Sequence, residues 1–235
     1  IQSGSLSSAS ESETFHVSDR FFELLQVLEI LSNPLEVEKS GETYRRRRLR
    51  TPSEIIVVYT YLPFSKQDHA YETGEANSAK LAIEIPLSMG AAKVLAIDPH
   101  PPIEYKWSQE LISSGKYEML SIMPQLIEKA KVLYKLYNPL ILSPPGKKKY
   151  KESELVDLKK KRLDSYTVMF EGSMDVEGRE IILADDLVLS GTTLMKTREK
   201  LFEMGAKEVV CCVPHKLPLK DGEEKLRNLL KKLDG

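Results

Sequence analysis

The sequence predicts an α/β fold in which mainly parallel sheets are flanked by helices. Short, continuous apolar runs such as EIIVVYTYLPF (residues 54–64) alternate along the chain with segments of helical spacing. Such runs are typical of parallel sheets covered on both faces. The chain has 235 residues, 41% of them hydrophobic, which is enough for one large or two small cores. A break near residues 110–120 divides it into two predicted domains, residues 1–117 and 118–235.

The first predicted domain begins, after a Ser-rich opening segment, with an amphipathic helix. Ser18 and Asp19 can cap this helix, whose apolar residues recur at intervals of three and four. The strand at 54–64 ends at Pro63, and a polar loop follows it. The remaining predicted elements are a helix over residues 76–89 and a strand over residues 90–98 that ends in Asp98, Pro99 and His100.

The second predicted domain repeats this alternation. A helix over residues 123–136 precedes the strand PLILS (139–143), and YTVMF (166–170) has the β-branched and aromatic composition of another strand. An apolar strand at 181–184 leads to the stretch DDLVLSGTT and then to a helical pattern that Gly205 closes. Both domains therefore end a strand in polar residues, at the edge where open α/β sheets bind ligands.

The composition excludes several classes of protein. The net charge is −1 with 29% charged residues, so we expect neither nucleic acid nor a membrane as a partner, and any anion site to be local. No apolar run approaches the roughly 20 residues that span a bilayer, which predicts a soluble protein. The two cysteines, Cys211 and Cys212, are adjacent in a predicted buried strand, which favours a reducing, cytoplasmic compartment. Because Ile1 is not a translation start, we expect the natural N-terminus to lie upstream of it.

Paired carboxylates follow the strand at 181–184. Asp185 and Asp186 stand at its carboxyl end, and residues 190–193 (SGTT) are predicted to begin the next helix. Backbone N–H groups and the helix dipole at such a start bind phosphate, and hydroxyl side chains add donors. Carboxylates beside a phosphate can accept hydrogen bonds from sugar hydroxyls or hold a magnesium ion. Simple helix capping is the alternative interpretation, but the order of strand, acids, loop and helix favours a sugar-phosphate site.

The stretch IILADDLVLSGTTL (181–194) resembles the phosphoribosyl-binding signature of the type I phosphoribosyltransferases and of the ribose-phosphate pyrophosphokinases. Two other segments resemble the second family. YLPFSKQDHAYETGEANSAKLAIEI (61–85) is similar to its Arg-Gln-Asp segment and the Ser-Ala-Lys helix after it, and VLAIDPH (94–100) is similar to its Asp-Leu-His strand end. The resemblance covers most of residues 19–226. It implies two phosphoribosyltransferase-like domains and a Mg²⁺-dependent ribose-phosphate diphosphokinase, which makes phosphoribosyl pyrophosphate and AMP from ATP and ribose 5-phosphate.

The resemblance also implies roles for individual residues. Asp185 and Asp186 would hold the ribose hydroxyls. Lys66, Gln67 and Asp68 match the segment that contacts ATP, although in isolation a lysine in a polar loop is more often a plain surface residue. Lys66 keeps the charge of the family's arginine but not its bidentate fork, so we expect weaker nucleotide binding. The 5-phosphate would be held by Ser190, Gly191, Thr192 and Thr193.

Three further residues are implied in catalysis. His100 matches a histidine at the family's phosphate site that assists a magnesium ion, although a lone histidine at a strand end is more often structural. In DLKKKRLDSYTV (157–168), Lys160 and Arg162 match the two cations of a mobile catalytic loop that closes over the transferring phosphates. Phosphoryl transfer depends on positioning and charge stabilisation, so such a loop suits the reaction. Without the resemblance, this charge run is typical of a solvated surface.

The chain departs from the family pattern at three places. Pro145 stands where the family has an acidic residue of the pyrophosphate region, and lysines 147–149 follow it. The family's Phe-Asp-Gly-Glu segment, which contacts adenine across a subunit interface, has only Gly41 and Glu42 as a partial counterpart. Thr192 replaces a loop glycine, which restricts positive φ.

These departures leave two alternatives to the synthase open. The first is a non-catalytic homologue that binds sugar phosphate or nucleotide and regulates a true synthase. The second, less favoured, is a phosphoribosyltransferase that acts on a base. The expected partners are ATP, ribose 5-phosphate and further copies of the chain, because family members build oligomers from dimers, up to hexamers.

Overall fold

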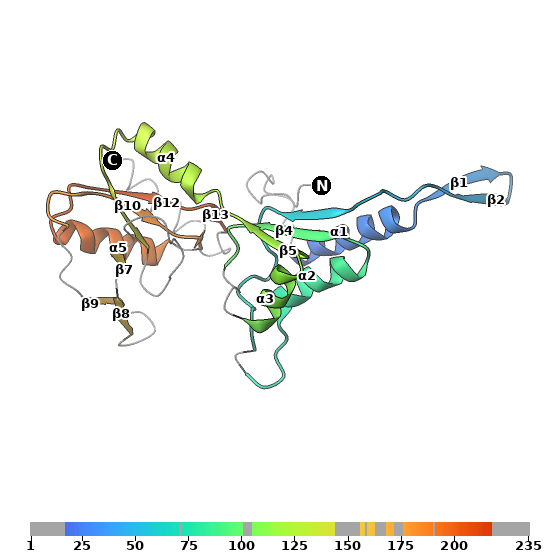
Figure 1. Cartoon of the computed structure of the whole chain (residues 1–235), viewed down its shortest axis with the longest axis horizontal. Helices are drawn as coiled ribbons and strands as arrows, with labels where there is room; N and C mark the ends of the chain where they lie inside the picture. Colours follow the sequence, from blue (N-terminus) through green and yellow to red (C-terminus); the bar gives the residue numbers. More distant parts are fainter. Residues whose placement is uncertain are drawn as a thin grey trace. The chain divides into compact units, whose positions relative to one another are not determined.

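The computed structural model describes residues 17–70, 72–100, 105–143, 156–157, 159–162, 168–171, 176–189 and 191–217. The chain forms two compact units, residues 1–121 and 122–235. The predicted α/β fold with mainly parallel sheets flanked by helices is confirmed (Figure 1).

The first unit is built on a parallel sheet of order β3-β4-β5. Helix α2 packs on β4, and α3 packs on β5. The predicted helices and strands of this half are present, whereas α3 and β5 have no counterpart among the predicted elements. The strands are β3 (Ile56–Tyr59), β4 (Lys93–Ile97) and β5 (Tyr117–Leu120), and the helices are α1 (Val17–Ser32), α2 (Ser78–Ser88) and α3 (Lys106–Ser113).

One face of this sheet carries the core of the first unit. Val57 and Tyr59 of β3 are buried in that core, while Ile56 and Val58 on the other face are 47% and 42% exposed. The structure therefore differs here from the predicted sheet with two covered faces. A continuous apolar run does not reveal whether a second layer packs on it, because both faces of a strand look alike when every residue is apolar.

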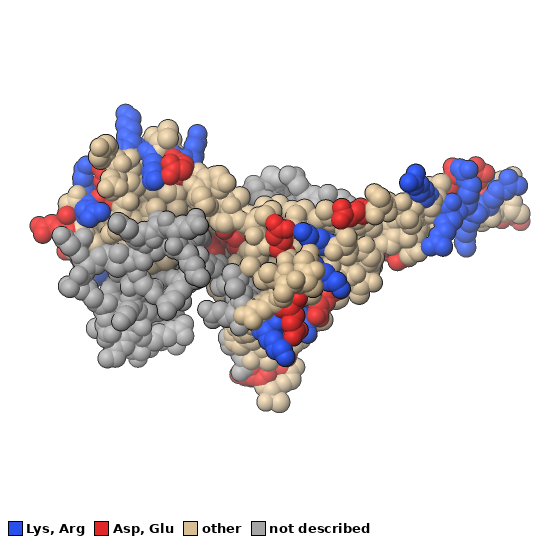
Figure 2. Space-filling model, in the orientation of Figure 1, with Lys and Arg blue, Asp and Glu red and all other residues tan. Residues whose placement is uncertain are grey.

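A two-stranded antiparallel ribbon lies between α1 and β3 in the chain. Its strands β1 (Leu35–Ser40) and β2 (Thr43–Arg48) meet at a turn in which Gly41 has a φ of 60°. The ribbon extends away from the rest of the first unit (Figure 1), and every residue of its strands except Glu36 is exposed. Figure 2 shows that lysine and arginine side chains gather on it. Arg47 pairs with Glu36 across the ribbon at 2.5 Å.

The second unit contains a parallel sheet of order β12-β10-β6-β7. Helices α4 and α5 cover opposite faces of it. Ile181 and Leu183 of β10 share a core cluster with leucines of α5, whereas Ile182 and Ala184 share another with residues of α4. This sheet has the two covered faces that the sequence predicts. Its elements are α4 (Met123–Leu133), β6 (Leu140–Ser143), β7 (Val156–Asp157), β10 (Glu180–Ala184), α5 (Thr192–Glu203) and β12 (Glu208–Cys212).

Two small strand pairs complete the second unit. β11 (Leu187–Val188) pairs in parallel with β13 (His215–Lys216), and β8 (Lys159–Arg162) pairs antiparallel with β9 (Val168–Glu171). Among the helices of the described ranges, none combines the length and the apolar character needed to cross a bilayer.

The two cysteines of β12 are free thiols on opposite faces of the sheet. Cys211 packs against the cluster under α5, and Cys212 lies in the cluster under α4, because successive strand residues point to opposite sides. Burial raises the pKa of the Cys211 thiol to about 11 and raises the pKa of Cys212 as well. Both thiols are therefore protonated at neutral pH, which disfavours reaction with electrophiles.

Candidate functional site

The loop after β3 leaves the carboxyl edge of the first unit's sheet. Phe64 takes a left-handed φ of 57°, and its ring meets Phe21 edge to face at 6.1 Å between centroids. The side chain of Ser65 is buried and donates to the Tyr61 hydroxyl at 3.0 Å. The loop therefore starts from residues fixed in the core.

The backbone of this loop is tied to the start of α2. The Gln67 amide donates to the Phe64 carbonyl at 2.8 Å, and the Gln67 carbonyl accepts from the Ala79 amide at 3.0 Å. Asn77 caps α2 by accepting from the Lys80 amide, and its own amide donates to the Asp68 carbonyl at 2.7 Å. These hydrogen bonds hold the backbone of Lys66 and Gln67 in place, while the side chains of both residues are exposed.

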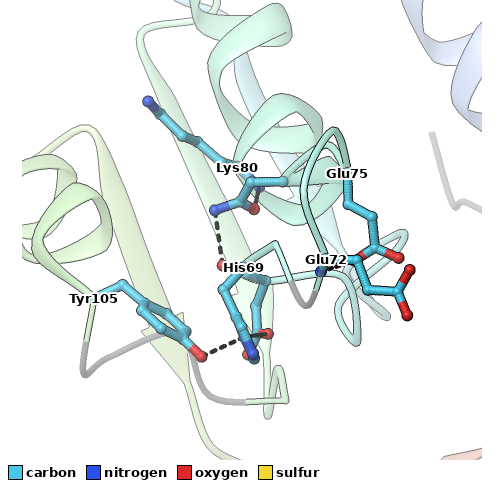
Figure 3. A network of polar contacts seen from close by, with 7 residues as sticks. His69, Glu72, Glu75, Lys80 and Tyr105 are labelled. Atoms are coloured by element: carbon cyan, nitrogen blue, oxygen red, sulfur yellow. Dashed lines mark hydrogen bonds and ion pairs between the residues drawn. The ribbon is translucent and has the colours of Figure 1, made fainter.

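Asp68 behaves differently from its two neighbours. It is only 5% exposed, and its Oδ1 lies 2.7 Å from Nδ1 of His69. The Tyr105 hydroxyl lies 2.6 Å from the same nitrogen. Figure 3 shows the Tyr105 and His69 side chains directed toward each other from the start of α3 and from the loop. No role for His69 or Tyr105 follows from the sequence pattern, because the two residues are 36 positions apart.

The strand end of β4 lies at the same edge, since β3 and β4 are parallel neighbours. Asp98 is buried and has a left-handed φ of 37°. Its Oδ1 accepts a hydrogen bond from Ser121 at 2.6 Å, and its amide donates to the Leu120 carbonyl. Residues held in such backbone conformations cluster at ligand sites. His100, two residues later and half-buried, is thus placed by a fixed turn.

In the second unit, β10 delivers two carboxylates to the carboxyl edge. Asp185 is 7% exposed and Asp186 is 1% exposed. The Asp185 amide donates to the Cys212 carbonyl, and the Asp186 amide donates to Oδ1 of Asp185 at 2.9 Å. Burying carboxylates is costly unless polar groups or cations oppose them. Two buried carboxylates in succession thus stand at the carboxyl end of β10.

Helix α5 begins at Thr192, two residues after the predicted start. Gly191 is its N-cap, with a left-handed φ of 72°. Thr192 and Thr193 are exposed in the first turn, where backbone amides have no acceptor within the helix. Thr192 itself is helical, so the turn needs a glycine at 191 and not at 192, and the departure of Thr192 from the family pattern does not strain this backbone.

Some predicted site residues fall outside this picture. Ser190, Pro145 and lysines 147–149 lie outside the described residues. Lys160 and Arg162 lie in β8, opposite Phe170 and Val168 of β9.

The described carboxylates fit one kind of magnesium site. Within the described ranges, no three His, Cys, Asp or Glu side chains come together as a metal cage. Mg²⁺ usually binds one or two carboxylates together with waters and substrate phosphates, and the Asp185 and Asp186 pair can supply that share. An imidazole suits softer metals better, so His100 in the first unit would meet a magnesium ion there only through one of its waters.

Comparison with curated proteins gives a consistent set of relatives. The ribose-phosphate pyrophosphokinase of Sulfurisphaera tokodaii is 26% identical over 188 residues, which are 75% of this chain and 62% of that protein. That of Sulfolobus acidocaldarius is 27% identical over the same shares. That of Aquifex aeolicus is 25% identical over 86% of this chain and 67% of that protein. The chain thus spans about 62% of the length of the first relatives it matches, and no protein-family model matches it.

Among solved structures, phosphoribosylpyrophosphate synthetase from Mycobacterium smegmatis superposes with a TM-score of 0.56. The match covers 87% of this chain and 81% of that one at 16% sequence identity, which shows the fold. The resemblance predicted from the three sequence motifs is therefore confirmed.

Proposed function

We propose that this chain, a relative of the ribose-phosphate pyrophosphokinases, transfers a diphosphate group from ATP to the 1-hydroxyl of ribose 5-phosphate. The observation that carries the proposal is the end of β10, where two buried carboxylates precede a helix that begins at Gly191. The products would be phosphoribosyl pyrophosphate and AMP.

Ribose 5-phosphate binds at the second unit in this proposal. Asp185 and Asp186 accept hydrogen bonds from the ribose hydroxyls, which offsets the cost of burying the two charges. The 5-phosphate lies on the first turn of α5, whose amides and positive dipole end attract an anion. Gly191, Thr192 and Thr193 stand at this helix start, and Ser190 belongs to the same proposed phosphate site by the sequence motif.

ATP binds at the first unit through the loop after β3. Lys66 pairs with a phosphate oxygen, and Gln67 donates or accepts one hydrogen bond. Their exposed side chains on a fixed backbone support this role. Asp68, the third residue of this segment, is buried as Asp185 and Asp186 are, and its Oδ1 lies 2.7 Å from Nδ1 of His69. His100, at the same sheet edge, faces the phosphates.

Magnesium would arrive with the nucleotide and neutralise the charge of the phosphate oxygens. Either His100 of the first unit, through water, or the carboxylates of Asp185 and Asp186 of the second unit would hold it. Lys160 and Arg162 from β8 complete the charge stabilisation of the transferred group, as the cations of a lid. The 1-hydroxyl oxygen of the sugar attacks the β-phosphorus and loses its proton to solvent. The bond between the β-phosphorus and the oxygen that bridges to the α-phosphorus breaks, and AMP leaves with that oxygen and its electron pair.

Phosphorus NMR of the protein with ATP, ribose 5-phosphate and Mg²⁺ tests this proposal. We expect the resonances of phosphoribosyl pyrophosphate and AMP to appear together, at equal rates. ADP without phosphoribosyl pyrophosphate would contradict it. The conversion should also require both substrates, because hydrolysis of ATP alone is a different reaction.

A non-catalytic homologue is the second candidate. It is favoured by Pro145, which stands in place of the family's acid, and by Gly41 and Glu42, which lack the Phe and the Asp of the family's adenine-contacting segment. Such a protein would bind ribose 5-phosphate in calorimetry and give neither product in the NMR experiment. In either case we infer a cytoplasmic protein that assembles from dimers of the chain, which light scattering would test.

A further inference from the structure

We propose that Tyr105 is a positioning residue of the nucleotide loop, and that its hydroxyl acts through the His69 ring. The inference rests on the proposed ATP site and adds to it a residue that acts on the site through another side chain. It is carried by a continuous series of hydrogen bonds from α2, through the loop, to α3.

The first link joins the loop to α2. Asn77 donates to the carbonyl of Asp68 at 2.7 Å while its own oxygen caps the helix at the Lys80 amide. This contact fixes the backbone of Asp68. It does not fix the direction of the His69 ring, which follows in the chain.

The second link fixes that ring. Asp68 Oδ1 lies 2.7 Å from Nδ1 of His69, and the Tyr105 oxygen lies 2.6 Å from the same atom. An ionised carboxylate can only accept, so the tautomer with hydrogen on Nδ1 satisfies it, with the tyrosine oxygen as a second acceptor. The two rings are also in contact, with centroids 5.4 Å apart. His69 is thus held between a buried acid and a tyrosine.

The third link anchors Tyr105. It is the N-cap of α3, and its carbonyl accepts hydrogen bonds from the amides of Ser108 and Gln109 and from the Ser108 hydroxyl. Its ring lies nearly parallel to that of Trp107, at an interplanar angle of 7° and a centroid distance of 6.5 Å. The side chains of His69 and Tyr105 therefore join the loop to the start of α3.

This tie lowers the cost of ordering the loop when a ligand binds. Lys66 and Gln67 stand three and two residues before His69, so their backbone moves with it. A loop that is already ordered loses less conformational freedom on binding. Loss of one hydrogen bond of ordinary strength should weaken ATP binding by about two- to ten-fold.

The fluorescence of Trp107 can report on the contact between Tyr105 and His69. Trp107 is the single tryptophan of the chain, so emission that is excited at the red edge of the absorption band, where tyrosine does not absorb, reports on the neighbourhood of Tyr105. Titration of the full chain with ATP and Mg²⁺ should change this emission, with the same midpoint that calorimetry gives for ATP. Ribose 5-phosphate alone should leave it unchanged.

Four variants separate positioning from a general loss of structure. Tyr105→Phe keeps the ring and loses the hydroxyl, and His69→Ala removes the ring. His69→Asn places an amide N–H near the position of Nδ1 and should restore part of the affinity lost in His69→Ala. Tyr137→Phe is the matched control, since Tyr137 is 96% exposed in the second unit.

We expect Tyr105→Phe and His69→Ala to weaken ATP binding two- to ten-fold, to reduce the emission change, and to leave ribose 5-phosphate binding and the thermal midpoint near those of the parent. Equal ATP affinity and equal emission change in Tyr105→Phe would overturn the positioning role while the ATP site stands. Absence of ATP binding in the parent chain would overturn both the ATP site and the role of Tyr105. If His69→Asn bound ATP no more tightly than His69→Ala, Nδ1 would not be the atom that connects the loop to Tyr105, and the proposal would be wrong.

Discussion

The two sheet edges of the molecule present polar groups in opposite ways. In the first unit, the side chains of Lys66 and Gln67 are exposed on a loop whose backbone is hydrogen-bonded to α2. In the second unit, the carboxylates of Asp185 and Asp186 are buried and the first-turn backbone of α5 is presented instead. A site made of exposed side chains should lose affinity gradually on substitution. A site that includes buried charges should lose more from a single change, because the partner groups are left unpaired.

The largest expected effect is on turnover, and it comes from the proposed catalytic loop and not from either sheet edge. Lys160→Ala should lower kcat by about 100- to 1,000-fold, because it removes a cation that stabilises charge only during transfer. Affinities for ATP and for ribose 5-phosphate should remain within about two-fold. Single-turnover kinetics and calorimetry would measure both. Lys161→Ala, next to it in β8, is the matched control, and normal turnover of Lys160→Ala would remove the lid from the mechanism.

The next effect concerns the buried pair. Asp186→Asn should weaken ribose 5-phosphate binding by about ten- to a hundred-fold, since a hydrogen bond to a charged group contributes about 1.5–3 kcal/mol. ATP binding in the same variant should not change. Calorimetry with each ligand separately distinguishes the two edges, and Glu203→Gln on the exposed side of α5 is the control. An unchanged affinity for ribose 5-phosphate would contradict the greater sensitivity that we expect at the edge with buried carboxylates.

A smaller effect is expected at the exposed loop. Lys66→Ala should weaken ATP binding by about three- to ten-fold, and Lys66→Arg should strengthen it, because a guanidinium can contact phosphate through two N–H groups. Ribose 5-phosphate binding should stay as in the parent. Lys93→Ala, at the amino end of β4, serves as the control for charge alone. A weaker ATP complex with arginine than with lysine would show that the contact is not a phosphate contact.

The smallest effect is a difference in alkaline stability between the units. The pKa of Cys211 is about 11 in the folded chain against an ordinary value of 9.0. The unfolded thiol therefore ionises first, and the second unit should lose up to about 2 kcal/mol as the pH rises from 9 to 11. Burial also raises the pKa values of Tyr59 and Tyr117 in the first unit above their ordinary value of 10.0. That unit should therefore weaken only as the pH passes the ordinary tyrosine pKa, where the unfolded phenols ionise first.

Denaturant unfolding at pH 8 and pH 10.5 tests this order. Trp107 emission follows the first unit, and protection of the two cysteines from alkylation follows the second. Cys211→Ala should reduce the loss in the second unit. Earlier loss of the Trp107 signal would show that the first unit is the more sensitive to alkali.

Much of the scaffold could be predicted from the sequence because buried elements carry a strong apolar signal. α1, β3, β4, α4 and β10 all correspond to predicted elements. The ribbon of β1 and β2 could not be found this way, since its second strand is Thr-Tyr-Arg-Arg-Arg-Arg and entirely exposed. α4 ends at Leu133 instead of 136, because Lys135 takes a left-handed φ of 53°. A glycine would have indicated this helix end in the sequence, but the position is a lysine.

The site was predictable in part for a similar reason. Local motifs placed Asp185, Asp186 and Gly191 at one sheet edge, where the structure has them. The contact between His69 and Tyr105 depends on how α3 folds back beside the loop. A sequence pattern does not reveal which residues so far apart in the chain come together. The left-handed turn at Asp98 is likewise a property of the folded strand end.

The exposed ribbon of β1 and β2 also bears on how the protein behaves in concentrated solution. A two-stranded ribbon has two open edges, and each open edge is a template for pairing with another chain. Four successive arginines, Arg45 to Arg48, run along one of these edges. Two ribbons that approach through β2 bring two such rows of arginine together. Their repulsion, which the Arg47–Glu36 pair within each ribbon lowers, acts over the roughly 8–10 Å of the Debye length at physiological salt. The arginines thus oppose pairing between ribbons of different chains, and this repulsion weakens as the salt concentration rises.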